Sequence, residues 1–185
     1  MTARYFVVEG NNDEFILQHL LPKPLLQDTK IIVASGYSAA LSVIQSLFTL
    51  TPLPVSFFFD TDTYSDDKIE EKKQFTNSYL KKLFANEFLL FPMKPEMEIL
   101  FFYKKDLFEK LIGQSIDNEL WQQAKYRPKQ ILNQLIGDNK SPFFLAENPI
   151  IKKNLTDDLV HELQQNPLLQ DIIRLHSFEP QAIIA

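Results

Sequence analysis

Short apolar runs alternate with amphipathic segments through the first half of the chain. Four runs, residues 4–9, 30–34, 55–59 and 87–91, are predicted strands. Helices are expected between them: from Asn11 or Asn12 to near Pro22, and from about residue 38 through residue 48. A polar, charged stretch over residues 66–73 is then expected to lead into a third helix that reaches about residue 84. Because each strand is apolar throughout, both faces of the sheet are expected to be covered. The pattern predicts an α/β fold with a mostly parallel four-stranded sheet flanked by helices.

Beyond Pro95 the pattern becomes mainly helical. Helices are predicted over residues 96–112, 116–125, 128–136 and 155–165. We therefore expect an α/β core over residues 1–95 and a helical C-terminal extension over residues 96–185, packed together as a single compact unit. Leu120, Trp121, Tyr126 and Phe143 are expected to belong to the core of the extension.

Composition narrows the class of protein. Hydrophobic residues make up 45% of the chain and charged residues 23%, which is typical of a globular domain. The absence of cysteine excludes disulfides and thiolate metal sites. The N-terminus enters a strand without a signal-peptide pattern, and no apolar stretch reaches the roughly 18 residues that span a bilayer, so a cytoplasmic protein is expected.

The net charge of −5 argues against a protein that coats nucleic acid by bulk electrostatics. The only basic surplus falls in residues 67–130, which hold twelve basic and ten acidic side chains. It follows an acidic segment, residues 1–66, with three basic and seven acidic side chains. Metal ions could invert the local field in that acidic segment.

The candidate chemistry lies where the predicted strands end. The first strand ends in Glu9-Gly10, the second in Ser35-Gly36 and the third in Asp60-Thr61-Asp62. Ligands of open α/β sheets bind beyond the carboxyl ends of the strands. Asp60 and Asp62, two residues apart on an extended backbone, are predicted to point to the same side, where Glu9 would join them.

Three converging carboxylates would repel one another unless a cation lies between them. Hard oxygen ligands favour Mg²⁺ or Mn²⁺. Gly10 and Gly36 are expected to leave room for a phosphate to approach the backbone. Asp66 and Asp67 could extend the metal site, although one of them is favoured as a cap of the following helix. Asp13 could be a first-turn helix acid or a ligand-supporting residue.

These motifs resemble the TOPRIM domain, which carries a glutamate-glycine after its first strand, a glycine after its second and Asp-x-Asp after its third. The matching residues are Glu9-Gly10 with Asp13, Ser35-Gly36 and Asp60-x-Asp62, within residues 4–67. In the OLD-like (overcoming lysogenization defect) branch a further glutamate follows the fourth strand. Within Pro95-Glu96-Met97-Glu98, Glu98 is the preferred match and Glu96 its rival.

The same branch uses a downstream lysine to stabilise the transition-state phosphate. Lys129 is the preferred match and Lys125 the alternative. The resemblance thus implies a catalytic set of Glu9, Asp60, Asp62 and Lys129, with Glu9, Asp60, Asp62, Glu98 and Asp13 as metal ligands.

The resemblance implies Mg²⁺- or Mn²⁺-dependent hydrolysis of phosphodiester bonds in nucleic acid, with DNA favoured over RNA. OLD-like TOPRIM domains are commonly joined to an ATPase, and this sequence contains no phosphate-binding P-loop motif. The resemblance therefore implies either a separately encoded ATPase partner or a pared-down free-standing form. A second hypothesis is a non-catalytic TOPRIM-like module that binds nucleotide, nucleic acid or a partner protein. The sequence leaves the oligomeric state open.

Overall fold

Four parallel strands form the centre of the computed structural model, which describes residues 2–83, 88–137 and 143–177. They are β1 (Arg4–Val8), β2 (Thr29–Val33), β3 (Val55–Asp60) and β4 (Phe88–Met93), in the order β2-β1-β3-β4. All neighbouring pairs are parallel. The predicted α/β class with a four-stranded parallel sheet is confirmed, although predicted strand residue Glu87 lies outside the described residues.

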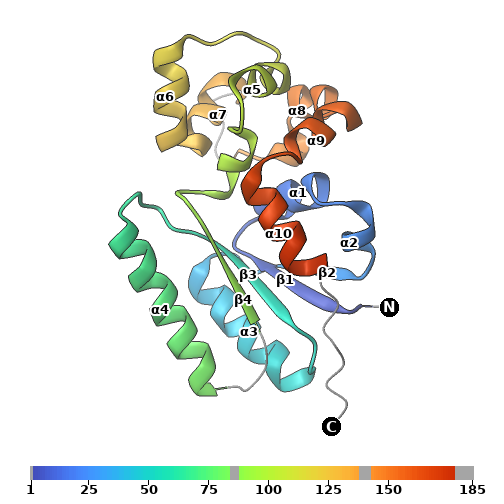
Figure 1. Cartoon of the computed structure of the whole chain (residues 1–185), viewed down its shortest axis with the longest axis vertical. Helices are drawn as coiled ribbons and strands as arrows, with labels where there is room; N and C mark the ends of the chain where they lie inside the picture. Colours follow the sequence, from blue (N-terminus) through green and yellow to red (C-terminus); the bar gives the residue numbers. More distant parts are fainter. Residues whose placement is uncertain (1, 84–87, 138–142, 178–185) are drawn as a thin grey trace.

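Helices cover both faces of this sheet (Figure 1). Successive residues of β3 alternate between the faces: Phe58 joins the larger apolar cluster, whereas Phe57 and Phe59 join the smaller one. The smaller cluster is formed with α3 (Tyr37–Leu50) and α4 (Asp66–Leu83). The larger cluster includes α1 (Asn11–Leu20) and α10 (Pro167–Ser177), with α2 (Lys23–Gln27) packed at its edge. Burial on both faces explains why the strands read as unbroken apolar runs.

The other helical segments gather at one end of the sheet (Figure 1). They are η1 (Met97–Phe101), α5 (Lys105–Ile112), α6 (Asn118–Tyr126), α7 (Pro128–Ile136), η2 (Leu145–Glu147), α8 (Pro149–Asn154) and α9 (Asp157–Leu163). The continuous helix predicted over 96–112 is wrong, because the chain forms a 3-10 turn and then an α-helix. None of the described helices is both long and apolar enough to cross a bilayer.

The last described helix returns to the sheet and packs on it. The His176 Nε2 atom lies 2.8 Å from the Ser56 hydroxyl of β3, and its Nδ1 atom lies 2.7 Å from the Ile172 carbonyl. A carbonyl can only accept, so Nδ1 carries the proton and Nε2 accepts from Ser56. Burial lowers the pKa of His176, which agrees with this neutral form. The expected division at residue 95 stays a prediction, while α10 completes one face of the sheet.

We predict that Ser56→Ala destabilises the fold by about 1–3 kcal/mol, because it leaves the buried Nε2 of His176 without a donor. The measurement is the urea midpoint with an unchanged slope. Ser42→Ala is the matched control, since the Ser42 hydroxyl is exposed and bonds only to the preceding turn of its own helix. Equal midpoints for the two variants would contradict the anchoring of α10 by this hydrogen bond.

Candidate metal site at the carboxyl ends of the strands

The parallel arrangement brings Glu9 next to the end of β3. Glu9 follows β1 directly, and β1 lies between β2 and β3. Its Oε1 atom accepts a hydrogen bond of 3.0 Å from the backbone N–H of Asp60. Burial raises the pKa of Glu9, opposed by this hydrogen bond and by the Lys72 charge. The first strand-end glutamate and the aspartate are therefore neighbours, as the sequence predicts.

A second set of backbone contacts brings the segment after β4 to the same place. The N–H groups of Thr61 and Asp62 donate to the Pro95 carbonyl at 2.8 and 3.0 Å. The N–H of Met97 then donates to Asp60 Oδ1 at 2.9 Å. Because the end of β3 and the start of η1 are joined this way, Glu98 is held close to Asp60.

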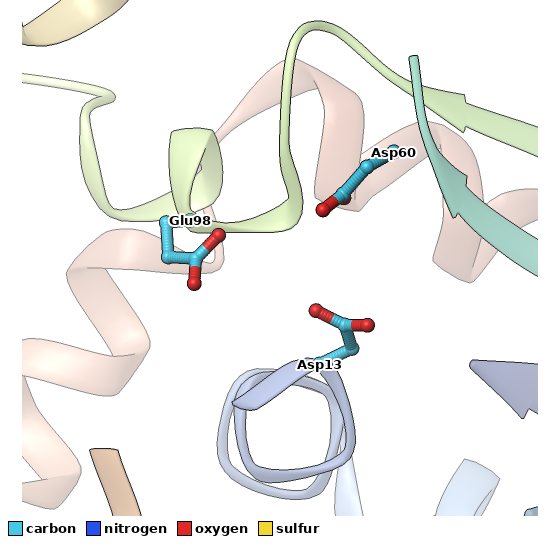
Figure 2. A group of neighbouring side chains, drawn as sticks. All are labelled: Asp13, Asp60 and Glu98. Atoms are coloured by element: carbon cyan, nitrogen blue, oxygen red, sulfur yellow. The ribbon is translucent and has the colours of Figure 1, made fainter. Parts of the chain in front are cut away.

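Three carboxyl groups from three segments meet here (Figure 2). Asp13 of α1, Asp60 of β3 and Glu98 of η1 each offer an oxygen within 4.8 Å of the others. Asp13 uses Oδ2 to accept the Gly10 N–H at 2.8 Å. Glu98 is completely buried, and neither of its oxygens has a hydrogen-bond partner among the described residues. An unpartnered buried carboxyl group beside two others is costly unless a proton or a cation resolves it.

The pKa values of the three groups reflect this crowding. Burial, and then the charges of Asp13 and Glu98, raise the pKa of Asp60 to about 8. Burial also raises the pKa of Glu98 to about 7, against the opposing effect of Lys129. The pKa of Asp13 is raised as well, mainly by burial. At neutral pH and without a cation, the cluster thus retains protons that isolated carboxyl groups would have lost.

A cavity of about 770 Å³ opens beside the cluster. One wall is formed by the strand ends and the start of α1, and the opposite wall by α7 and the segment before η2. Its lining includes Glu9, Gly10, Asp13, Ser35, Asp60, Asp62, Glu96, Lys129, Asn133, Phe143 and Phe144. Five carboxylate side chains and one lysine therefore share a space large enough for part of a polymeric substrate.

Asn12 ties the two walls together. Its side-chain amide donates to the Phe143 carbonyl at 3.1 Å and accepts from the Leu145 N–H at 3.0 Å. The Asn12 side chain is buried, so these bonds are shielded from water. The sequence suggested Asn11 or Asn12 as helix cap, but the cap position is Gly10, whose N–H is satisfied by Asp13.

The structure separates the rival candidates for the lysine and the second glutamate. Lys129 lines the cavity, and although burial lowers its pKa, the charges of Glu98, Asp60, Asp13 and Glu96 together raise it. Lys125 does not line the cavity and lies over the Trp121 ring at 5.1 Å. Glu98 belongs to the buried cluster, while Glu96 lines the cavity.

Asp62 lies apart from the buried cluster. The backbone at Asp62 is left-handed, with φ of 53°, so the predicted extended backbone after Asp60 is wrong. The Asp62 side chain is 75% exposed and lies 3.8 Å from Lys72 Nζ. The cause is a long-range contact: the N–H groups of Thr61 and Asp62 both bond to the Pro95 carbonyl and turn the chain directly after β3. Asp62 still lines the cavity beside Glu9.

The two strand-end glycines have different surroundings. Gly10 lines the cavity, and an added Cβ there would meet only Asp13 Oδ2, at an ordinary 3.7 Å. Gly36 has φ of 109°, which suits glycine, but its neighbour Ser35 is the residue that lines the cavity. Gly36 is therefore required by backbone conformation. The approach of a phosphate to these glycines stays a prediction.

The sequence does not indicate the role of Lys72, whose context is an ordinary charged helix. Lys72 donates to the Asp60 carbonyl at 2.6 Å and lies over the Tyr37 ring at 4.6 Å.

Two further expectations concern residues near the site. Tyr126 is expected in the core, but it is 63% exposed. Asp66 and Asp67 fall in the first turn of α4, where Asp66 pairs with Lys94 at 2.6 Å.

Comparison with known proteins finds similarity at the level of solved structures. No family model matches the chain, and no curated protein matches it significantly. Among solved structures, the chain is similar to the C-terminal region of the OLD protein of Xanthomonas campestris pv. campestris, at 12% identity and a TM-score of 0.41. The match covers 95% of this chain and 97% of that one. At this level of similarity no residue role transfers from that protein.

The raised pKa values predict how stability depends on pH without divalent metal. Asp60 binds its proton more tightly when folded, so its contribution is present at acid pH and is lost as pH rises through about 8. Each such group can contribute at most about 1.4 kcal/mol per pH unit. The free energy of unfolding should therefore fall as the pH rises from the ordinary pKa of an aspartate, 3.8, to about 8. The Asp60→Asn variant should show a weaker dependence of this free energy on pH.

The control for this prediction is Asp62→Asn, which removes an exposed carboxylate outside the buried cluster and should keep the wild-type slope. Added Mn²⁺ competes with protons for the cluster, so its stabilising effect should increase with pH. A wild-type curve as flat as that of Asp60→Asn would show that the cluster holds no proton.

We predict that Lys72→Met lowers stability by about 1 kcal/mol, because it removes a hydrogen bond to the end of β3 and a cation–π contact with Tyr37. Lys73→Met is the control, since Lys73 is exposed and lies 3.9 Å from Glu70 within its own helix. Thermal unfolding of the two variants checks this, and identical losses would remove the role given to Lys72.

Proposed function

We propose that this chain is a Mg²⁺- or Mn²⁺-dependent hydrolase of phosphodiester bonds in nucleic acid, built as an OLD-like TOPRIM domain. The observation that carries the proposal is Glu98, completely buried beside Asp13 and Asp60 with no partner for either oxygen among the described residues. A buried carboxyl group without a partner is costly unless a proton or a cation satisfies it. A cation would give all three groups a ligand.

The residues present fit a hard divalent cation. Asp13, Asp60 and Glu98 would hold one ion through oxygen atoms only, which favours Mg²⁺ or Mn²⁺ over softer metals. Glu9 and Asp62 line the same cavity and would serve a second ion. Such ions supply Lewis-acid activation of the phosphate and of water in an in-line displacement.

The protein's own groups would orient the substrate and stabilise charge. Lys129 lies across the cavity from the strand ends, and its raised pKa keeps its ammonium group charged beside a phosphate. In that position it would neutralise the charge that develops on the phosphate oxygens in the transition state. Lys72 acts indirectly, since it holds the Asp60 carbonyl and lies near Asp62.

The strand-end motifs give independent support for the family assignment. Glu9-Gly10, Ser35-Gly36 and Asp60-x-Asp62 occur in the TOPRIM order, and the fold has the parallel sheet that such motifs require. The resemblance further implies DNA as substrate and an ATPase as a separate partner. We also propose residues 1–95 as the α/β core and residues 96–185 as a helical extension packed on it.

We predict that the purified chain nicks or linearises plasmid DNA in Mn²⁺ or Mg²⁺ and not in EDTA. Asp60→Asn and Glu98→Gln should each reduce the rate by at least about a hundredfold, because each removes an anionic ligand from the buried cluster. Gel-based cleavage rates with labelled DNA and RNA measure this and identify the preferred polymer.

Asp158→Asn is a suitable control, because Asp158 is an exposed acid in the first turn of α9 that does not line the cavity. It should cleave at the wild-type rate. If Mn²⁺ raises the unfolding temperature of the wild type and Glu98→Gln abolishes this shift while no nucleic acid is cleaved, the chain is a metal-binding module without catalysis. Cleavage that survives Asp60→Asn would overturn the site.

A further inference from the structure

An exposed tyrosine, Tyr126 at the end of α6, packs against the partly buried Tyr64 of the β3–α4 loop. The rings of Tyr64 and Tyr126 have centroids 4.9 Å apart at an angle of 52°. The Tyr64 hydroxyl donates to the Lys125 carbonyl, which fixes that ring against the last turn of α6. Tyr126 is thus held in place on one side, while 63% of its side chain stays exposed to solvent.

This pair adjoins the cavity. Tyr64 follows the cavity-lining Asp62 by two residues. Burial, and then the charge of the cavity-lining Glu96, raise the pKa of Tyr64 to about 12. Glu96 also accepts the Lys129 N–H at 3.1 Å. Tyr126 precedes Lys129 by three residues, across the junction of α6 and α7. The aromatic surface and the proposed phosphate-binding lysine therefore belong to one rim.

The cations near this rim differ in what holds them. Lys94 is paired with Asp66, and Lys125 lies over the Trp121 ring. Arg127, by contrast, is exposed, and within residues 2–83, 88–137 and 143–177 no hydrogen bond or ion pair holds its guanidinium group. Lys129 faces the cavity. An exposed ring beside two available cations matches the chemistry of an unpaired nucleotide, whose base stacks while its phosphates pair with cations.

We propose that Tyr126, supported by Tyr64, stacks on an unpaired nucleobase next to the phosphate held in the cavity, while Arg127 binds a neighbouring phosphate. This inference rests on the proposed function and specifies its substrate class: single-stranded nucleic acid, or a strand end whose last base is free. A base inside a duplex has both faces covered by its neighbours, so it cannot use this platform.

The experiment separates base stacking from charge. Fluorescence anisotropy measures binding of a labelled oligothymidylate and of an abasic oligonucleotide of equal length and charge, in Ca²⁺ to occupy oxygen-ligand sites. Wild-type protein should bind the oligothymidylate about tenfold more tightly. Tyr126→Ala should lose this preference and Tyr126→Phe should keep it. Arg127→Ala should weaken binding of both oligonucleotides by the same factor.

Phe75→Ala is the matched control, because Phe75 is also an exposed ring beside a tyrosine, 6.1 Å from Tyr79, but lies outside the cavity lining. It should keep the full preference. Unfolding temperatures establish that each variant is folded. Equal wild-type binding of the two oligonucleotides, or an unchanged preference in Tyr126→Ala, overturns the stacking platform.

The two proposals fail in different ways. If the wild type shows no preference for the oligothymidylate but cleaves nucleic acid in a metal-dependent reaction that requires Asp60 and Glu98, the stacking platform alone is overturned. If the wild type binds neither oligonucleotide and cleaves no nucleic acid, both the platform and the nucleic-acid substrate are wrong. Binding of an unrelated acidic peptide as tightly as the oligothymidylate would identify the rim as a protein-binding surface instead.

Discussion

Three carboxyl groups that would repel one another in water are held within 4.8 Å of each other by elements that cannot easily move apart. Asp60 ends a strand buried between two others, Asp13 lies in the first turn of the helix that follows β1 and accepts the Gly10 N–H, and Glu98 lies in a turn bonded to the end of β3. The surrounding apolar core has a low dielectric constant, which strengthens the repulsion between ionised carboxylates at this position. The fold thus holds three carboxyl groups so close together that a proton or a cation must neutralise part of their charge, and this requirement explains the properties of the site.

The helical extension contributes residues to the acidic site and packs on the sheet. Lys129 supplies positive charge from α7, and its N–H is bonded to Glu96 of the sheet-connected segment. Asn12 joins α1 to the segment before η2, and His176 returns α10 to β3. One apolar cluster runs through residues from β1 to α10. The two halves of the sequence therefore meet at the site as well as in the core.

Much of the sheet and part of the site follow from sequence because both depend on local patterns. The apolar run before Asp60 predicts a buried strand, and strand-end residues of parallel sheets meet at one edge. Glu98 and Asp62 depend on a long-range contact, the Pro95 carbonyl bonded to two N–H groups after β3, which no local pattern indicates. That contact turns Asp62 outward. The turn at Met97–Phe101, read as part of a longer helix, brings Glu98 to the cluster.

The position of Tyr126 is also one that local sequence patterns do not predict. An aromatic residue at the end of an amphipathic helix is usually packed inside, and only its position at the junction of α6 and α7 leaves it exposed. Lys72 likewise reads as one of several lysines on a charged helix. Its contact with the Asp60 carbonyl becomes visible only when α4 is placed beside β3.

Asp13 serves two partners at once, since one oxygen holds the Gly10 amide while the carboxyl group also faces Asp60 and Glu98. Anything that draws electron density from this carboxylate weakens the hydrogen bond that satisfies the Gly10 N–H at the start of α1. The neighbouring Asn12 bonds to Phe143 and Leu145 on the opposite wall. The carboxyl group of the acidic cluster and the amide that joins the two walls are therefore neighbours in the first turn of α1, and the Gly10 amide proton is a natural spectroscopic reporter of the state of Asp13.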